Sequence, residues 1–122
     1  MDNVEINSEF QRLDFENIIW VIFVFLSILN LFGDSLEKEY LESNNNSIKT
    51  KTNQLFIISI LATLLIYIYF FLRNYYALYN ISDDKKELYT IKILASIFFV
   101  LGTMCLLYFQ INQSSFIGTP AI

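Results

Sequence analysis

The chain has 122 residues, of which 55% are hydrophobic, and carries a formal net charge of −4. This length allows one domain, and the hydrophobic share is higher than most soluble globular domains contain. The acidic balance leaves no basic surface for nucleic acid, so we expect no nucleic-acid partner.

The first uncharged segment covers residues 17–33. A helix of this length covers about 25 Å, because each residue adds about 1.5 Å, and it only just crosses the hydrocarbon core of a bilayer. Ser8 and Gln11 have the spacing of a capping box, which predicts that the helix begins near Ser8. Apolar spacing and opposite charges four residues apart continue beyond Gly33, so we expect this helix to extend to about Ser43.

The second uncharged segment covers residues 53–72 and follows an Asn-rich break at residues 44–47. Thr50 or Thr52 is the expected N-cap of its helix. A basic residue and several tyrosines come next, as in the aromatic belt at a membrane surface. We therefore predict a second transmembrane helix over residues 53–79.

The third apolar segment begins after Lys92, beyond which the chain holds no charged residue. Asp84 is suited to cap its helix, which predicts a helix over residues 84–111 and an irregular tail over residues 112–122. The sequence thus predicts an all-α integral membrane protein, with three transmembrane helices in a small bundle and a single transmembrane domain covering residues 1–122.

Lysine and arginine residues predict the orientation through the positive-inside rule. One side of the membrane holds five of them and the other side holds three. This count favours a cytoplasmic N-terminus. The frequent use of Ile, Asn, Phe and Tyr is typical of an AT-rich genome, so we expect the protein in a bacterial cytoplasmic membrane.

Several side chains that catalysis and metal binding need are missing from the sequence. It contains no histidine, which excludes histidine-based zinc sites, bis-histidine haem ligation and Ser-His proteolysis. The three uncharged segments hold no acid, lysine or arginine that could relay protons within the membrane. We therefore expect no enzyme activity, no metal and no cofactor.

Small and hydroxyl residues recur along one side of each predicted span. Such stripes face protein and not lipid in membrane helix bundles. They are either the internal packing faces of the bundle, or a partner-binding surface or water-filled path. The candidate residues are Ser27, Asn30, Ser59, Thr63, Tyr67, Asn74, Ser96, Gly102 and Thr103.

Arg73 directly follows the second uncharged segment and lies on the same membrane side as the start of the first. A guanidinium at this depth gains from a carboxylate partner, so we expect an ion pair with Glu16 or Asp14. At an exposed interface such a pair contributes no more than about 1 kcal/mol. Lys92 reaches a similar level and competes for the same acid, and Arg73 has the alternative of extending to lipid phosphate.

By elimination, the sequence favours a small non-catalytic membrane protein that acts through helix–helix contacts, as an accessory subunit, a regulator or an immunity-type protein. Its expected partners are the lipid bilayer and another membrane protein or a second copy of itself. The alternative is an oligomeric pore-forming protein of the holin kind. Holins usually end in a charge-rich tail, whereas this chain ends without a charge after Lys92.

Overall fold

The structure is a computed structural model that describes residues 2–113. Its elements are α1 (Asn3–Ser43), α2 (Asn46–Tyr79), a short 3-10 helix η1 (Asp83–Lys85) and α3 (Lys86–Asn112). Each of the three long helices contains a stretch long and apolar enough to cross a membrane, and the described residues contain no strand. The predicted fold class, an all-α membrane protein with three transmembrane helices, is therefore confirmed.

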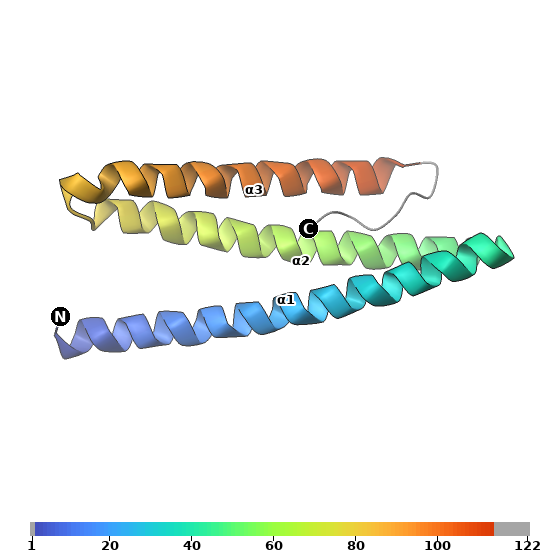
Figure 1. The fold of residues 1–122 in the computed structure, drawn as a ribbon, viewed down its shortest axis with the longest axis horizontal. Helices are drawn as coiled ribbons and strands as arrows, with labels where there is room; N and C mark the ends of the chain where they lie inside the picture. The colour runs from blue at the N-terminus through green and yellow to red at the C-terminus, as the bar shows by residue number, and fades with distance from the viewer. Residues whose placement is uncertain (1, 114–122) are drawn as a thin grey trace.

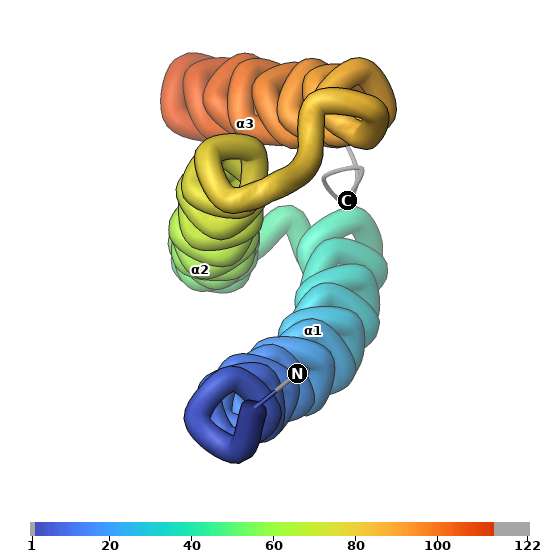
Figure 2. Tube along the Cα trace, turned by 90° about the vertical axis from the view of Figure 1, so that its left-hand side faces the viewer, coloured from blue at the N-terminus to red at the C-terminus, as the bar shows by residue number. Residues whose placement is uncertain are grey.

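The three helices run antiparallel to their chain neighbours, and α2 is the central one (Figure 1). Both α1 and α3 pack against α2, whereas no Cα atom of α1 lies within 8 Å of a Cα atom of α3. Viewed near the long axis of the molecule, α1 and α3 leave α2 in different directions (Figure 2). The protein is thus two helical hairpins that share one helix, with an open side between the outer two.

The helix starts differ from those expected. The Asp2 carboxylate accepts a hydrogen bond from the Glu5 amide at 2.8 Å, so α1 begins before Ser8 and the capping-box prediction is wrong. In the same way the Asn45 side chain caps α2 by accepting from the Ser47 amide at 2.9 Å. The predicted threonine caps lie inside α2, where Thr52 donates to the Ile48 carbonyl, because an Asx cap is available earlier in the chain.

The other ends lie close to their expected positions. Helix α1 passes Gly33 and ends at Ser43, where Asn44 adopts a left-handed conformation with φ of 55°. The 3-10 turn precedes α3, which begins at Lys86, two residues after the expected start at Asp84. Asn112, assigned to the tail from the sequence, is the last helical residue, and residues 114–122 lie outside the described part.

The α1 extension beyond the membrane segment packs against the start of α2. Among the described residues, Asp34 and Lys38 do not form the ion pair expected within the extension. Instead the Lys49 ammonium of α2 lies 5.8 Å from the centre of the Tyr40 ring of α1. The close antiparallel approach of α2 therefore keeps this part of α1 helical.

The interface between α1 and α2 follows a strict alternation of three and four residues on both helices, which is the spacing of a coiled-coil seam. Its buried apolar centre consists of Ile19, Leu26 and Ile66, and Phe56 is fully buried beside Gly33. The seam positions are Glu16, Ile19, Phe23, Leu26, Asn30 and Gly33 on α1, and Phe56, Ser59, Thr63, Ile66, Phe70 and Arg73 on α2.

The interface between α2 and α3 is joined by side-chain amides near both of its ends. Near one end the Asn74 amide donates to the Ser96 hydroxyl at 2.8 Å. Near the other end the Gln110 amide donates to the Asn53 carbonyl oxygen at 2.7 Å, and Gln110 is only 1% exposed. Hydrogen bonds between membrane helices contribute about 0.6 to 2 kcal/mol each, so these two pairs fix the register of α3 on α2.

Candidate functional site: a groove between the outer helices

The open side of the molecule contains a groove whose floor is α2. We divide it into a mouth segment, close to the charged end, and a middle segment, close to the centre of the bundle. Their volumes are about 510 Å³ and about 360 Å³. The mouth segment is lined by Trp20, Phe23, Tyr67, Phe70, Arg73, Asn74, Lys92, Ala95, Ser96 and Phe99. The middle segment is lined by Ile60, Thr63, Tyr67, Phe98, Phe99, Gly102, Thr103 and Leu106.

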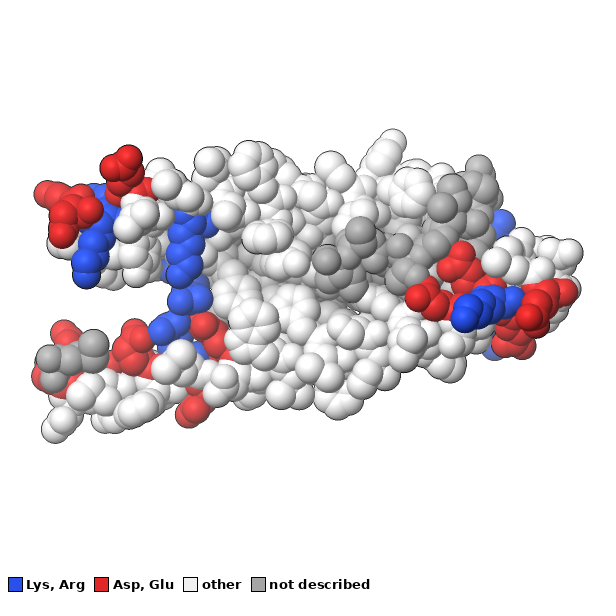
Figure 3. Space-filling model, viewed as in Figure 1, with Lys and Arg blue, Asp and Glu red and all other residues white. Residues whose placement is uncertain are grey.

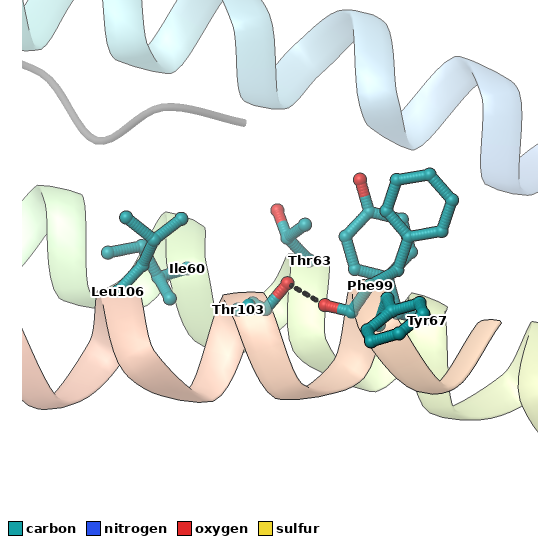
Figure 4. A pocket seen from close by; sticks show the side chains of 8 residues that line it. Ile60, Thr63, Tyr67, Phe99, Thr103 and Leu106 are labelled. Atoms are coloured by element: carbon teal, nitrogen blue, oxygen red, sulfur yellow. Dashed lines mark hydrogen bonds between the residues drawn. The ribbon is translucent and has the colours of Figure 1, made fainter. Parts of the chain in front are cut away.

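The middle segment has polar side chains, but its hydroxyls are already used within their own helices. Thr63 donates to the Ser59 carbonyl at 2.9 Å, and Thr103 donates to the Phe99 carbonyl at 2.7 Å. Figure 4 shows these two threonines side by side, one from α2 and the other from α3. Because their donors are satisfied, this surface suits an apolar occupant better than a column of water.

Gly102 makes the middle segment deeper. A methyl group built at Gly102 would meet no atom within 4 Å, so no side chain of the described residues needs the space that this glycine leaves. The contrast with Gly33 is clear, because a methyl group there would run into the Phe56 ring and lie 3.1 Å from Leu55 Cδ2. Gly33 serves the interior of the protein, whereas Gly102 opens a notch on its surface.

At the charged end, the Glu16 carboxylate joins α1 to α2. Its Oε2 atom lies 3.2 Å from Arg73 Nε and 3.2 Å from an Arg12 Nη atom, and it accepts a hydrogen bond from the Tyr69 hydroxyl at 3.3 Å. The side chains of Glu16 and Arg73 are 9% and 27% exposed. The pair is therefore less exposed than we expected from the sequence. Each of its contacts contributes more to stability than it would at an open surface.

The other predicted participants lie apart from this pair. Asp14 is exposed on α1. Lys92 does not compete for Glu16, because its ammonium lies over the Tyr89 ring at 5.7 Å from the ring centre. Of the two acids proposed for Arg73, the structure brings Glu16 to it.

Arg12 also binds Glu9, through a contact of 2.7 Å at the exposed start of α1. The hydrogen bond from Arg12 and its positive charge hold the pKa of the Glu9 carboxyl below its usual value of 4.5. The same bond raises the pKa of the Arg12 guanidinium above its usual value. Glu9, Arg12, Glu16 and Arg73 thus form one continuous chain of alternating charges.

The predicted packing stripe is mostly inside the protein. Ser27 is the exception: it is exposed, and its hydroxyl donates to the Phe23 carbonyl at 3.0 Å. It lies outside the interface between α1 and α2, whose seam passes through positions 26 and 30, and its assignment to a partner-facing surface stays a prediction. Tyr67 is half-buried and Gly102 is exposed, both in the groove. The buried members are Asn30, Ser59, Thr63, Asn74, Ser96 and Thr103.

Sequence reasoning missed Arg12 and Tyr69 as partners of Glu16, and also the pair of Gln110 with Asn53. The first two partners could have been predicted from the sequence, because Arg12 precedes Glu16 by one helical turn and Tyr69 precedes Arg73 by one turn. The third needed the relative register of α2 and α3. No local pattern carries that register, because Gln110 and Asn53 are far apart in the chain.

Residues 2–113 hold no group of three or more His, Cys, Asp or Glu side chains arranged to bind a metal ion. Comparisons with protein-family models, with curated proteins and with solved structures found no match for this chain.

Proposed function

We propose that this membrane protein is non-catalytic and acts by docking a transmembrane helix, from another membrane protein or a second copy of the chain, into the middle segment of the groove. The support comes from the arrangement of its helices. No Cα atom of α1 lies within 8 Å of one of α3, and the residues that line the middle segment all belong to α2 and α3, so this segment is left open for a further helix. In lipid, helix association depends on close van der Waals packing, which a notch of this kind provides.

Gly102 is the observation that carries the proposal. Glycine within a helix lowers its stability by about 1 kcal/mol relative to alanine. At Gly33 the close approach of α2 offsets this loss, but at Gly102 no neighbour within the described residues does so. A helix from outside the chain that packs closely against α3 would give Gly102 the same role.

The test is a pull-down from the native membrane in mild detergent, with mass spectrometry and a cross-linking assay for self-association. Gly102→Leu places a side chain in the notch, where a Cβ atom meets no described residue within 4 Å outside the backbone of α3, and it should reduce partner recovery about tenfold while leaving thermal stability equal or higher. Met104→Phe is the matched control, because Met104 is half exposed on α3 and lines neither groove segment. Equal recovery with both variants would refute docking at this segment.

The rival proposal is a holin-like oligomeric pore. A pore requires that the polar side chains of the groove face water. The hydroxyls of Thr63 and Thr103 instead donate to carbonyls of their own helices, which argues against a pore. Dye release from vesicles separates the two proposals. A helix-docking protein should leave vesicles sealed at all protein densities, whereas a pore-former should release dye steeply above a threshold density.

For its cellular setting we propose a bacterial cytoplasmic membrane with the N-terminus on the cytoplasmic side. The support is residue usage and the excess of basic residues at the end that holds Arg12, Arg73 and Lys92. Reporter fusions decide the orientation. Fusions at Asn46 and after Ile122 that are both active only in the cytoplasm would contradict a cytoplasmic N-terminus, because three spans place both positions on the side opposite the N-terminus.

A further inference from the structure

We infer that the mouth segment of the groove is a binding site for an anionic phospholipid, with the phosphate held between Arg73 and Lys92 and an acyl chain on the aromatic floor. This inference is independent of the proposed helix docking, which concerns the middle segment.

Two cations line the mouth, and the acid next to them, Glu16, is shared between Arg73 and Arg12. Arg73 and Lys92 are the charged residues among those that line it, and no acid lines it. Figure 3 shows basic side chains bridging the gap between the two sides of the molecule near one end. The mouth therefore attracts an anion.

Both cations keep hydrogen-bond donors for that anion. Arg73 meets Glu16 through Nε, so its two terminal amino groups remain for a phosphate, which guanidinium groups bind through two parallel bonds. Lys92 is exposed, and its ammonium contacts the Tyr89 ring, with no carboxylate in ion-pair range among the described residues. An ammonium of this kind binds phosphate as a point charge.

The position of the mouth selects a lipid rather than a free ion. Arg73 follows the last uncharged residue of the second span, and Lys92 precedes the first uncharged residue of the third. Both side chains are thus placed where hydrocarbon gives way to headgroups. Basic pockets between transmembrane helices at this level are typical sites for anionic headgroups.

The floor below the cations is apolar and aromatic. The Trp20 ring lies 5.7 Å from Phe23 and 5.9 Å from Phe70, measured between ring centres, and Phe99 stacks on Tyr67 at 5.1 Å. The volume of about 510 Å³ falls within the range of small-molecule sites, which are mostly apolar with a few placed polar groups. An amphipathic anion fits this combination, and inorganic phosphate would leave most of it empty.

Trp20 is the only tryptophan of the chain and lines the mouth, so its fluorescence reports on the site without any label. The protein is placed in phosphatidylcholine vesicles that contain a minor fraction of phosphatidylglycerol. Bromine, which quenches tryptophan, is carried by the acyl chains of either the phosphatidylglycerol or an equal fraction of phosphatidylcholine. We expect stronger quenching by the brominated phosphatidylglycerol.

Two lysine variants test whether the preference for phosphatidylglycerol arises at the mouth segment. Lys92→Gln should lower the selectivity for phosphatidylglycerol about fivefold, the effect of one basic residue near a lipid surface. Lys85→Gln makes the same charge change at the same end of the molecule, on an exposed residue that does not line the groove, and should leave selectivity unchanged. A matched reporter, Trp20→Phe with Tyr108→Trp, places the tryptophan on the exposed face of α3 and should show no preference.

Equal quenching by the two brominated lipids in the wild-type protein would overturn the proposal. So would equal losses of selectivity in Lys92→Gln and Lys85→Gln, which would indicate a general surface attraction. Added inorganic phosphate, against chloride of the same ionic strength, should leave the preference unchanged. A preference abolished by phosphate would assign the site to a free ion. Gly102→Leu should retain the lipid preference, so a failure of the helix-docking proposal can be distinguished from a failure of the lipid proposal.

Discussion

Gly33 of α1 lies directly against the fully buried ring of Phe56 on α2, with the distance between the two helices set by the missing side chain. In lipid, where apolar surface gains little from leaving its solvent, such close contact is a main source of helix association. The glycine that could have ended α1 is therefore a point of close contact between α1 and α2.

We predict that Gly33→Ala destabilises the protein by about 1 to 3 kcal/mol, because its methyl group would overpack a closed interface. Gly102→Ala is the control. It gains helix propensity, and its methyl group would meet no described residue within 4 Å outside the backbone of α3, so it should be neutral or stabilising. Denaturant unfolding in detergent followed by circular dichroism measures both, and a Gly33→Ala variant as stable as Gly102→Ala would contradict the close approach.

We predict a coupling free energy of about 1 kcal/mol between Glu16 and Arg73, the upper end of the range for ion pairs that are partly exposed. A double-mutant cycle with Glu16→Gln and Arg73→Gln on unfolding in detergent measures it. Asp14→Asn in place of Glu16→Gln is the matched control and should be additive with Arg73→Gln, because Asp14 is exposed. Additivity in both cycles would show that the contact of 3.2 Å adds nothing to stability.

Asn30 and Ser59 carry a different prediction. Both are buried, at 6% and 0% exposure, and the Asn30 amide and the Ser59 hydroxyl have no hydrogen-bond partner in the described residues. Their helices place them opposite each other, one turn from the Gly33–Phe56 contact. Replacing Asn30 with leucine removes two unpaired polar atoms at similar size, so it should stabilise the fold by about 1 to 3 kcal/mol. A loss of stability would mean that the amide is paired in the membrane.

The Glu9 carboxyl should titrate below its usual pKa of 4.5, because Arg12 binds its charged form. A depressed folded-state pKa means that this contact stabilises the fold above pH 4.5 and is lost as the pH falls through the folded-state value. Carbon-13 NMR of the side-chain carboxyl in detergent measures the titration. In Arg12→Gln the pKa should return toward 4.5, while Asp84→Asn, at an exposed site on the turn before α3, should leave it unchanged because Asp84 is not among the groups that shift Glu9.

The number and extent of the helices could be predicted from the sequence, because a helix that crosses a bilayer needs an uninterrupted apolar segment of a minimum length. The helix starts were predicted less well, since Asp, Asn, Ser and Thr all cap helices and several of them precede each span. The buried faces of the helices were predicted in part. The amides and hydroxyls of Asn30, Ser59 and Ser96 marked buried positions, but Ser27 satisfies its own hydroxyl within α1 and can face outward.

The groove could not be predicted from residue patterns. The residue pattern of each helix indicates which of its sides avoids lipid, but not which neighbouring helix covers that side. That α3 packs on α2 and not on α1 depends on long-range contacts such as Asn74 with Ser96. The lining of the groove by residues of three helices, including Trp20 and Lys92, follows only from that choice.

The lack of contact between α1 and α3 also dictates an order of assembly. Helix α1 has no partner until α2 is made, so its buried stripe, with the Asn30 amide and the Glu16 carboxylate, must face lipid or the insertion machinery until then. Once Tyr79 has been added, the first hairpin has all of its contacts, and α3 joins a surface that is already formed. A chain that stops before α3 keeps one complete interface, whereas a chain without α2 keeps none.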